Sequence, residues 1–191
     1  MLIAHRSRPR VGEQANGDTV VIRETDGWTL LAVVDALGHG PEAEKVAAMA
    51  AETLLLLDPG TGARVAVEAM HAALRHSRGA AAMIAVVRRQ QLEGCGVGNV
   101  LLRVQGTRIP VTLSPGVLGT RVRRIHPFVG PLPPGSRVVM VSDGISQRFR
   151  FAQHRAVVPE ALCQMLMNSY GKAHDDATVL VADVEDDGAR R

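Results

Sequence analysis

The order of predicted elements in this 191-residue chain indicates an α+β fold, with helices packed on antiparallel sheet. Two strand-like segments come first and two helix-like segments follow. A long run of short strand-like segments then precedes one more helix and a final strand. Because the middle strands are so closely spaced, hairpins and meanders are favoured over βαβ units. A doubly wound parallel sheet is therefore disfavoured.

The first half of the chain predicts two strands and two helices. Residues 19–24 and 28–35 are rich in strand-forming side chains, and the turn sequence Thr25-Asp26-Gly27 separates them. Residues 42–57 follow Pro41 and contain mostly Ala, Glu, Met and Leu, which favours a helix. Residues 64–78 have a similar composition and stop at Gly79, so a second helix is expected there.

The second half predicts mainly short strands divided by glycine and proline. The expected strands are 80–88, 94–104, 108–113, 120–128 and 136–142. A helix is expected over 159–170 and a last strand over 177–184. The charged residues from 184 to 191 are expected to form a frayed tail.

Length and composition predict one globular domain over residues 1–191. With 46% hydrophobic residues the chain can bury one sizeable core, and no apolar run is long enough to span a bilayer. The first residues lack a signal-peptide layout, so a cytoplasmic protein with no membrane partner is expected. Cys95 and Cys163 predict neither a disulfide framework nor a zinc site.

The charge pattern gives little support to nucleic-acid binding. The net charge is only +3, and the chain holds one Trp, one Tyr and three Phe, too few for a stacking platform. The densest basic cluster, residues 121–124, alternates like the solvent face of a strand. No nucleic-acid partner is expected.

Three apolar strand segments each carry an acidic residue at one end. Asp35 follows the run 30–34, Asp143 follows the run 138–142, and Asp175 and Asp176 precede the run 177–181. If these strand ends meet, their like charges are tolerated only when the carboxyls are protonated or when cations bind. Since Mg²⁺ and Mn²⁺ favour carboxylate, carbonyl and water ligands, the pattern predicts a site for hard divalent cations.

Four motifs in a fixed order carry a family resemblance: Asn16-Gly17-Asp18, Asp-Ala-Leu-Gly-His-Gly at 35–40, Ser142-Asp143-Gly144, and Asp-Asp-Ala-Thr at 175–178. With them the chain resembles the metal-dependent Ser/Thr protein phosphatases of the PPM or type 2C family, in particular its small SpoIIE-like bacterial branch. The resemblance implies a four-layer αββα sandwich, two antiparallel sheets flanked by helices. It also implies hydrolysis of phosphoserine or phosphothreonine by metal-activated water.

The same resemblance assigns roles to individual residues. It implies two Mn²⁺ or Mg²⁺ ions bridged by Asp35, with the backbone carbonyl of Ala36 as a further ligand. Asp143 and Asp175 would bind on the other side, and Asp18 would complete the ligand set. Two such ions can activate a water and neutralise the charge that develops during an in-line displacement.

Each of these residues also has a plainer interpretation. Asp18 and Asp143 each lie beside a glycine and can be simple turn formers. Asp176 is expected to be an outer or exposed neighbour rather than a ligand, because adjacent strand residues point to opposite faces. His39 lies beside the acids and is a candidate proton donor to the leaving alkoxide, while a purely structural role is equally open.

Two departures from the family pattern bear on the site. The family has glycine after the bridging aspartate, where this chain has Ala36. If that residue requires a positive φ, alanine costs about 1 kcal/mol and metal affinity falls. No phosphate-binding arginine is evident either: Arg6, Arg8 and Arg10 precede the first motif, but a solvated N-terminal segment is the competing interpretation.

The resemblance also implies a partner, namely a phosphorylated STAS-domain regulatory protein of a stressosome or an anti-sigma-factor antagonist. Segment 145–158 follows Asp143-Gly144 and combines aromatic residues with arginines, so Arg148 and Arg150 are candidate partner-binding residues. The alternative is a short helix that packs its Phe149 and Phe151 in the core. For the whole chain, the alternative to an enzyme is a catalytically silent, metal-binding regulatory module.

Overall fold

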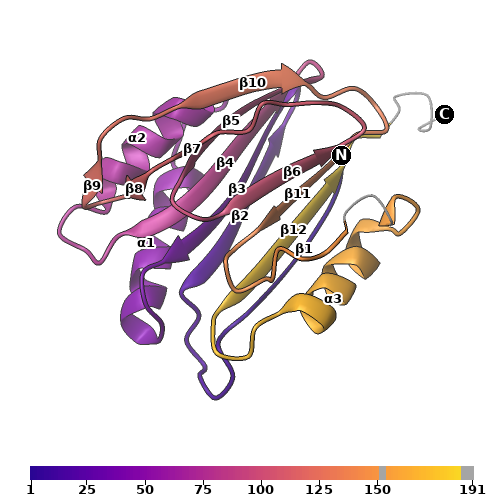
Figure 1. Ribbon diagram of the computed structural model, residues 1–191. Helices are drawn as coiled ribbons and strands as arrows, with labels where there is room; N and C mark the ends of the chain where they lie inside the picture. The colour runs from indigo at the N-terminus through magenta and orange to yellow at the C-terminus, as the bar shows by residue number, and fades with distance from the viewer. Residues whose placement is uncertain (151–153, 186–191) are drawn as a thin grey trace.

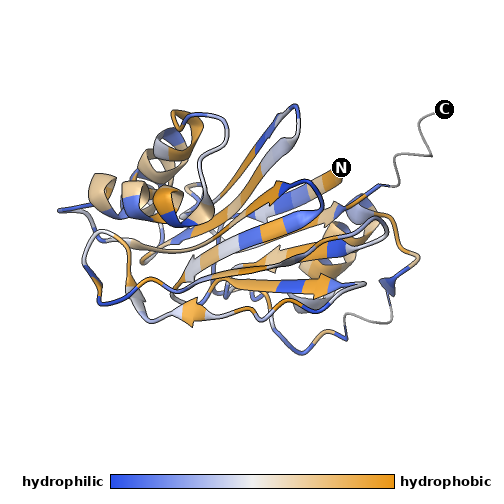
Figure 2. Ribbon diagram, turned by 90° about the horizontal axis from the view of Figure 1, so that it is seen from above, coloured by the Kyte–Doolittle hydropathy of each residue, from blue (hydrophilic) through white to orange (hydrophobic). Residues whose placement is uncertain are grey.

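The computed structural model describes residues 1–150 and 154–185, and it is a four-layer sandwich (Figure 1). Helices α1 (Pro41–Leu55) and α2 (Ala63–Ala73) cover one outer face, and α3 (Pro159–Tyr170) covers the other. Two sheets lie between them, as the view from above in Figure 2 also shows. The αββα architecture predicted from the resemblance is therefore confirmed.

Most strand pairs in the two sheets are antiparallel. The four-stranded sheet has the order β1-β12-β11-β6, and the larger sheet has the order β10-β5-β4-β3-β2, with β7 pairing parallel to β5. A small hairpin, β8-β9, stands apart. The strands are β1 (Leu2–Arg8), β2 (Asp18–Thr25), β3 (Trp28–Ala36), β4 (Ala80–Arg88), β5 (Gln91–Val97), β6 (Leu101–Gln105), β7 (Leu113–Ser114), β8 (Gly116–Val117), β9 (Arg121–Val122), β10 (Pro127–Pro131), β11 (Arg137–Val141) and β12 (Ala177–Asp183).

Three apolar layers hold the four structural layers together. One lies between α1, α2 and the larger sheet, one between the two sheets, and one between the four-stranded sheet and α3. Strand β3 serves two of them. Leu30, Ala32 and Val34 pack toward the helices, while Leu31 and Val33 pack toward the other sheet. A strand that is buried on both faces has apolar side chains at successive positions, which explains the continuous apolar run before Asp35.

Several predicted elements are confirmed. Helix α3 has the predicted bounds, α1 ends two residues earlier than expected, and strands β2, β3, β4, β11 and β12 match within two residues at each end. Helix α2 ends at Ala73 instead of residue 78, and His76 has a left-handed φ of 69° a few residues later. Among the described residues, no helix combines the length and apolar character needed to cross a bilayer.

The predictions for the middle of the chain are partly wrong. The single strand expected over 94–104 is two strands, β5 and β6, which belong to different sheets. Gly98 turns the chain between them with φ of 88°. Residues 108–112 form no strand, and the strand expected over 120–128 is replaced by β9 and the start of β10. The tail predicted from residue 184 lies, from 186 onward, outside the described residues.

The N-terminal segment is a strand rather than a solvated arm. Residues Leu2–Arg8 pair antiparallel with the whole of β12. The exposed and half-buried side chains of an edge strand give little apolar alternation, so the sequence pattern did not predict it. The consequence for the site is that Arg8 and Arg10 are held close to the loop before β12.

Candidate functional site

Asp18 and Asp35 lie directly opposite each other at one end of the larger sheet. Asp18 begins β2, Asp35 stands next to the end of β3, and the two are paired in the antiparallel register. Residues directly opposite share one face of a sheet. Asp35 alternates with Leu31 and Val33, so this face is the one that points toward the second sheet.

Burial makes these two carboxyls hard to ionise without a cation. Asp18 is only 5% exposed, and burial raises its pKa to about 7 against the lowering effect of hydrogen bonds from Ser142 and Thr178. Burial raises the pKa of Asp35 to about 8, and the neighbouring charge of Asp18 adds to the increase. A carboxyl pair of this kind is stabilised when positive charge lies between its members.

Ser142, directly after β11, connects the Asp18–Asp35 pair to the second sheet. The Ser142 hydroxyl donates to Asp18 Oδ2 at 2.6 Å and accepts the backbone N–H of Thr178 at 3.0 Å. One side chain therefore joins β2 of the larger sheet to β11 and β12 of the smaller one. The sequence motif Ser142-Asp143-Gly144 contained this residue, but only the acid was singled out.

Asp143 follows Ser142 and is held by residues that carried no signal in the sequence. Asn99, in the turn between β5 and β6, donates to Asp143 Oδ2 at 2.6 Å. Burial raises the pKa of Asp143, the charge of Asp175 raises it further, and Lys172 opposes the increase. The strand-end acids of both sheets are thus close enough to influence one another.

Asp176 is buried and bound to the backbone, so of the two positions expected for it the exposed one is wrong, and the outer one beside the proposed ligands agrees with the structure. Its Oδ1 accepts the backbone N–H of Arg10 at 2.7 Å, and its Oδ2 accepts that of Gly17 at 2.8 Å. It is 4% exposed. Asp176 therefore fixes both ends of the loop that leads into Asp18, while the side chain of the half-buried Asp175 interacts with that of Asp143.

The donor set fits a hard divalent cation. Asp18, Asp35, Asp143 and Asp175 supply carboxylates, Ala36 supplies a carbonyl at the end of β3, and no sulfur ligand lies among them. In residues 1–150 and 154–185, no three His, Cys, Asp or Glu side chains already surround a common ion position. The mutual raising of carboxyl pKa values is the observation that favours a cation here.

Ala36 does not need the left-handed conformation considered for it. It lies outside the residues with positive φ, ends β3, and pairs in register with Ala80. Its amide donates to the carbonyl of Gly17 at 3.0 Å. The alanine therefore causes no backbone strain, and the reason for expecting a lower metal affinity is removed.

We expect Ala36→Gly to keep activity and metal affinity but to lower the free energy of unfolding by about 1 kcal/mol. The Ala36 methyl is fully buried against α1 and α2, and glycine adds backbone entropy to the unfolded chain. Denaturant unfolding measures the expected loss of stability, and Mn²⁺ calorimetry measures the metal affinity. A change in Mn²⁺ affinity beyond about threefold would contradict the conclusion that only the carbonyl matters.

His39 lies on the exposed side of the loop after Asp35. Its Nδ1 is 2.7 Å from Glu13 Oε1, and its Nε2 is 2.8 Å from Arg10 Nη1. Because a guanidinium can only donate, Nε2 accepts and Nδ1 carries the proton. In this arrangement Nε2 is occupied by Arg10 and cannot donate a proton. The role of His39 as proton donor stays a prediction, and it would require Arg10 to move away from Nε2.

Arg148 and Arg150 are exposed, and Phe149 between them is buried. The alternative interpretation was a short helix with Phe149 packed in the core. Phe149 is indeed buried, but residues 145–150 form no helix. The Phe149 ring lies edge-on to Tyr170 with centroids 5.8 Å apart. Phe151 lies outside the described residues.

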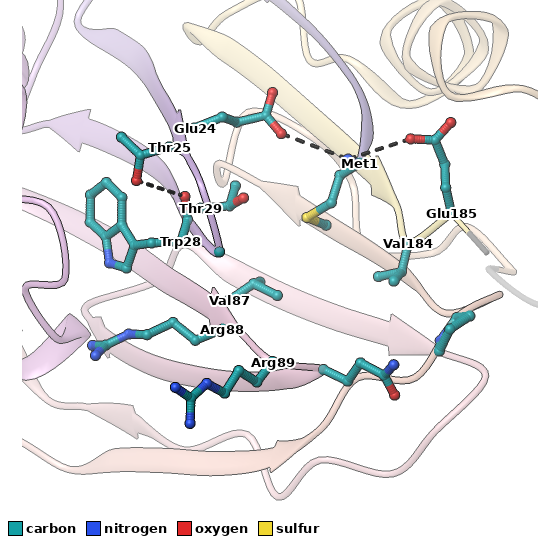
Figure 3. A pocket seen from close by; sticks show the side chains of 13 residues that line it. Met1, Glu24, Thr25, Trp28, Thr29, Val87, Arg88, Arg89, Val184 and Glu185 are labelled. Carbon is teal, nitrogen blue, oxygen red and sulfur yellow. Dashed lines mark hydrogen bonds and ion pairs between the residues drawn. The ribbon is translucent and has the colours of Figure 1, made fainter. Parts of the chain in front are cut away.

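A pocket at the opposite end of the sheets contains none of the predicted site residues (Figure 3). It lies between the ends of β2 and β4 and the start of β3. The amino group of Met1 is 3.7 Å from Glu24 Oε1 and 3.4 Å from Glu185 Oε2. Arg88 and Arg89 line its other side. The acid cluster is thus separate from this pocket.

Comparison with known proteins identifies the family of the chain. The sequence model of the family described as Stage II sporulation protein E (SpoIIE) matches residues 25–185, which include Asp35, Asp143 and Asp175. The match begins after Asp18, whose place in the site comes from its pairing with Asp35. No curated protein sequence matches the chain.

Solved structures show the same fold over nearly the whole chain. One, from work described as "The bacterial stressosome: a modular system that has been adapted to control secondary messenger signaling", is 29% identical over 94% of this chain and 97% of that one, with a TM-score of 0.88. RsbX in complex with magnesium is 20% identical over 96% and 94%, with a TM-score of 0.84. The Mycobacterium tuberculosis serine/threonine phosphatase PstP/Ppp is 18% identical over 96% and 98%, with a TM-score of 0.72.

Proposed function

Because the chain belongs to the SpoIIE family of PP2C-type serine/threonine phosphatase domains, we propose that it hydrolyses phosphoserine or phosphothreonine on a bacterial stress-signalling protein. The observation that supports this most directly is the pairing of Asp18 with Asp35 at a sheet end where Asp143 also lies. Two Mn²⁺ or Mg²⁺ ions, held by Asp18, Asp35, Asp143, Asp175 and the Ala36 carbonyl, would supply a water of lowered pKa and neutralise phosphoryl charge.

Other residues of the chain would serve this reaction by holding the proposed ligand carboxylates in place. Ser142 fixes the Asp18 carboxylate, Asn99 fixes that of Asp143, and Asp176 fixes the loop that leads into Asp18. Such outer contacts orient carboxylates that would otherwise sample several rotamers. The presence of all four expected acids, Asp18, Asp35, Asp143 and Asp175, favours an active enzyme over a silent metal-binding module.

Hydrolysis of para-nitrophenyl phosphate with and without Mn²⁺ tests this proposal. Turnover that requires Mn²⁺ or Mg²⁺ and is stopped by a chelator is the expected result. Mn²⁺ binding without turnover would instead support the silent regulatory module. An absence of both would contradict the metal centre itself.

We propose a phosphorylated STAS-domain regulator, of a stressosome or an anti-sigma-factor system, as the cytoplasmic partner. The support is the 29% identity to a chain solved in work on the bacterial stressosome, together with the likeness to RsbX. Both of those chains are covered over more than nine tenths of their length. Dephosphorylation of a panel of phosphorylated STAS domains would identify which of them is the substrate.

Arg148 and Arg150 are proposed to bind this partner. In the described part of the chain neither guanidinium has a hydrogen bond or an ion pair. The backbone that carries them is held from behind, because Arg103 donates to the carbonyls of Gln147 at 3.0 Å and Phe149 at 3.2 Å. The Arg103 guanidinium also lies 4.6 Å from the Phe149 ring centroid. Two unpaired arginines on an anchored turn suit an acidic or phosphorylated surface.

We expect the double change Arg148→Ala with Arg150→Ala to lower kcat/KM for the phosphoprotein by about tenfold and to leave para-nitrophenyl phosphate hydrolysis unchanged. Only the large substrate can use binding energy away from the reacting group. The matched control is Arg123→Ala with Arg124→Ala, two exposed arginines after β9. Equal losses on both substrates would place Arg148 and Arg150 in the catalytic site or the fold.

A further inference from the structure

Lys172 connects the loop that carries Asp143 to the loop that carries Asp175. It lies between α3 and β12, and its side chain is half-buried. Its Nζ donates to the backbone carbonyl of Asp143 at 2.5 Å, and its backbone N–H donates to that of Gly144 at 2.8 Å. One residue therefore binds two consecutive carbonyls directly at a proposed metal ligand.

The turn that holds Lys172 is itself fixed from the other side. Arg8, at the end of β1, donates through Nη2 to the Lys172 carbonyl at 2.8 Å and through Nη1 to the Asp175 carbonyl at 3.4 Å. An isolated bridge between Ile145 and Gly171 adds a further contact between the two loops. Movement of the Lys172 side chain would thus remove the bond to the Asp143 carbonyl but leave the Asp175 loop anchored.

The choice of lysine at this position is unusual for the chain. Its other lysine, Lys45, is exposed on α1 and pairs with Glu42 at 2.6 Å. Lys172 instead directs an ammonium group to a main-chain oxygen beside a cluster of acids. A positive charge there repels an incoming cation. We therefore look for the role of Lys172 in the position of the Asp143 loop, which its side chain binds.

We propose that Lys172 is a positioning residue, which holds the Asp143 loop against the Asp175 loop so that both carboxylates are presented to the same divalent-cation site. The inference rests on the proposed metal centre, and it concerns a residue outside the ligand set. Contacts of this kind behind metal ligands typically change metal affinity by about 10-fold to 100-fold when removed.

The sign of the change in Mn²⁺ affinity tests the inference. In Lys172→Met both the hydrogen bond and the positive charge are lost. Loss of the charge removes a repulsion toward Mn²⁺, but it also removes the effect that opposes the increase in the Asp143 pKa. Binding is therefore compared over a range of pH, and weakening that persists as the pH rises and the carboxyls ionise comes from lost positioning. We expect calorimetry to show affinity weakened by about tenfold or more. Lys172→Arg, which keeps charge and donor, should stay within about threefold of the parent.

Lys45→Met is the matched control and should bind Mn²⁺ as the parent does. Thermal unfolding without metal confirms that each variant is folded, and Lys172→Leu, which also lacks a donor and a charge, replaces Lys172→Met if the latter is not. Unchanged or tighter Mn²⁺ binding in folded Lys172→Met would overturn the inference, even with a lowered melting temperature. If the parent protein binds no Mn²⁺, the proposed metal centre is wrong and the inference falls with it.

Discussion

Replacing Asp35 with asparagine is expected to lower metal-dependent phosphatase activity by at least about 10³-fold while the fold survives. Asp35 lies opposite Asp18, and its pKa is raised first by burial and then by the charges of Asp18, Asp143 and Asp175. Asparagine keeps the size and one oxygen but cannot supply the negative charge that a shared cation requires. Initial rates on para-nitrophenyl phosphate at saturating Mn²⁺ measure the loss.

Without metal, the same change should stabilise the protein at alkaline pH. The pKa of folded Asp35 is about 8, above the ordinary value for an aspartate, so the folded state holds its proton more tightly than the unfolded state. The free energy of unfolding of the parent therefore decreases as the pH rises through the range up to about 8. Asparagine has no proton to lose, so its melting temperature in chelator at pH 9 should exceed that of the parent.

Asp26→Asn is the control for both measurements, because Asp26 is exposed in the turn between β2 and β3, at the other end of these strands from Asp18 and Asp35. It should leave rate and melting temperature unchanged. Activity retained by Asp35→Asn would contradict the assignment of the site. A fall in its melting temperature in chelator would show that Asp35 is stabilised by contacts other than a cation.

The sequence predicted the acids of the site better than the residues that hold them. Asp35 and Asp143 each end a strand that is buried on both faces, and such strands have a strong apolar signal. Asn99, Lys172 and Arg8 act through one or two hydrogen bonds each, across long sequence separations. No local pattern marks such contacts, because they depend on how the two sheets meet.

The fold shows a similar division. Strands next to tight turns, such as β2 and β3, were predicted because their pairing is local. Strand β1 pairs with β12 at the other end of the chain, and β5 and β6 separate into different sheets at Gly98. Pairing partners that are distant in sequence leave no periodic signal in an edge strand.

Gly144→Ala is expected to destabilise the protein by more than about 3 kcal/mol and to abolish metal-dependent activity. Gly144 follows Asp143, but it is not among the residues with a left-handed φ. The structure gives another reason: a Cβ on Gly144 would lie 1.8 Å from the carbonyl oxygen of Asp176. Since that atom belongs to the main chain, relief requires the two loops to move apart.

This displacement would act on both sides of the site at once. The carbonyl of Gly144 accepts the Lys172 N–H, and Asp176 holds the loop before Asp18. Gly60→Ala is the control, because Gly60 has φ of 91° but nothing within 4 Å of its Cβ position, so it should lose only about 1 to 2 kcal/mol. Denaturant unfolding compares the two. If Gly144→Ala loses no more than Gly60→Ala and still binds Mn²⁺, then the close approach of the two loops is not what holds Asp143 and Asp175 together.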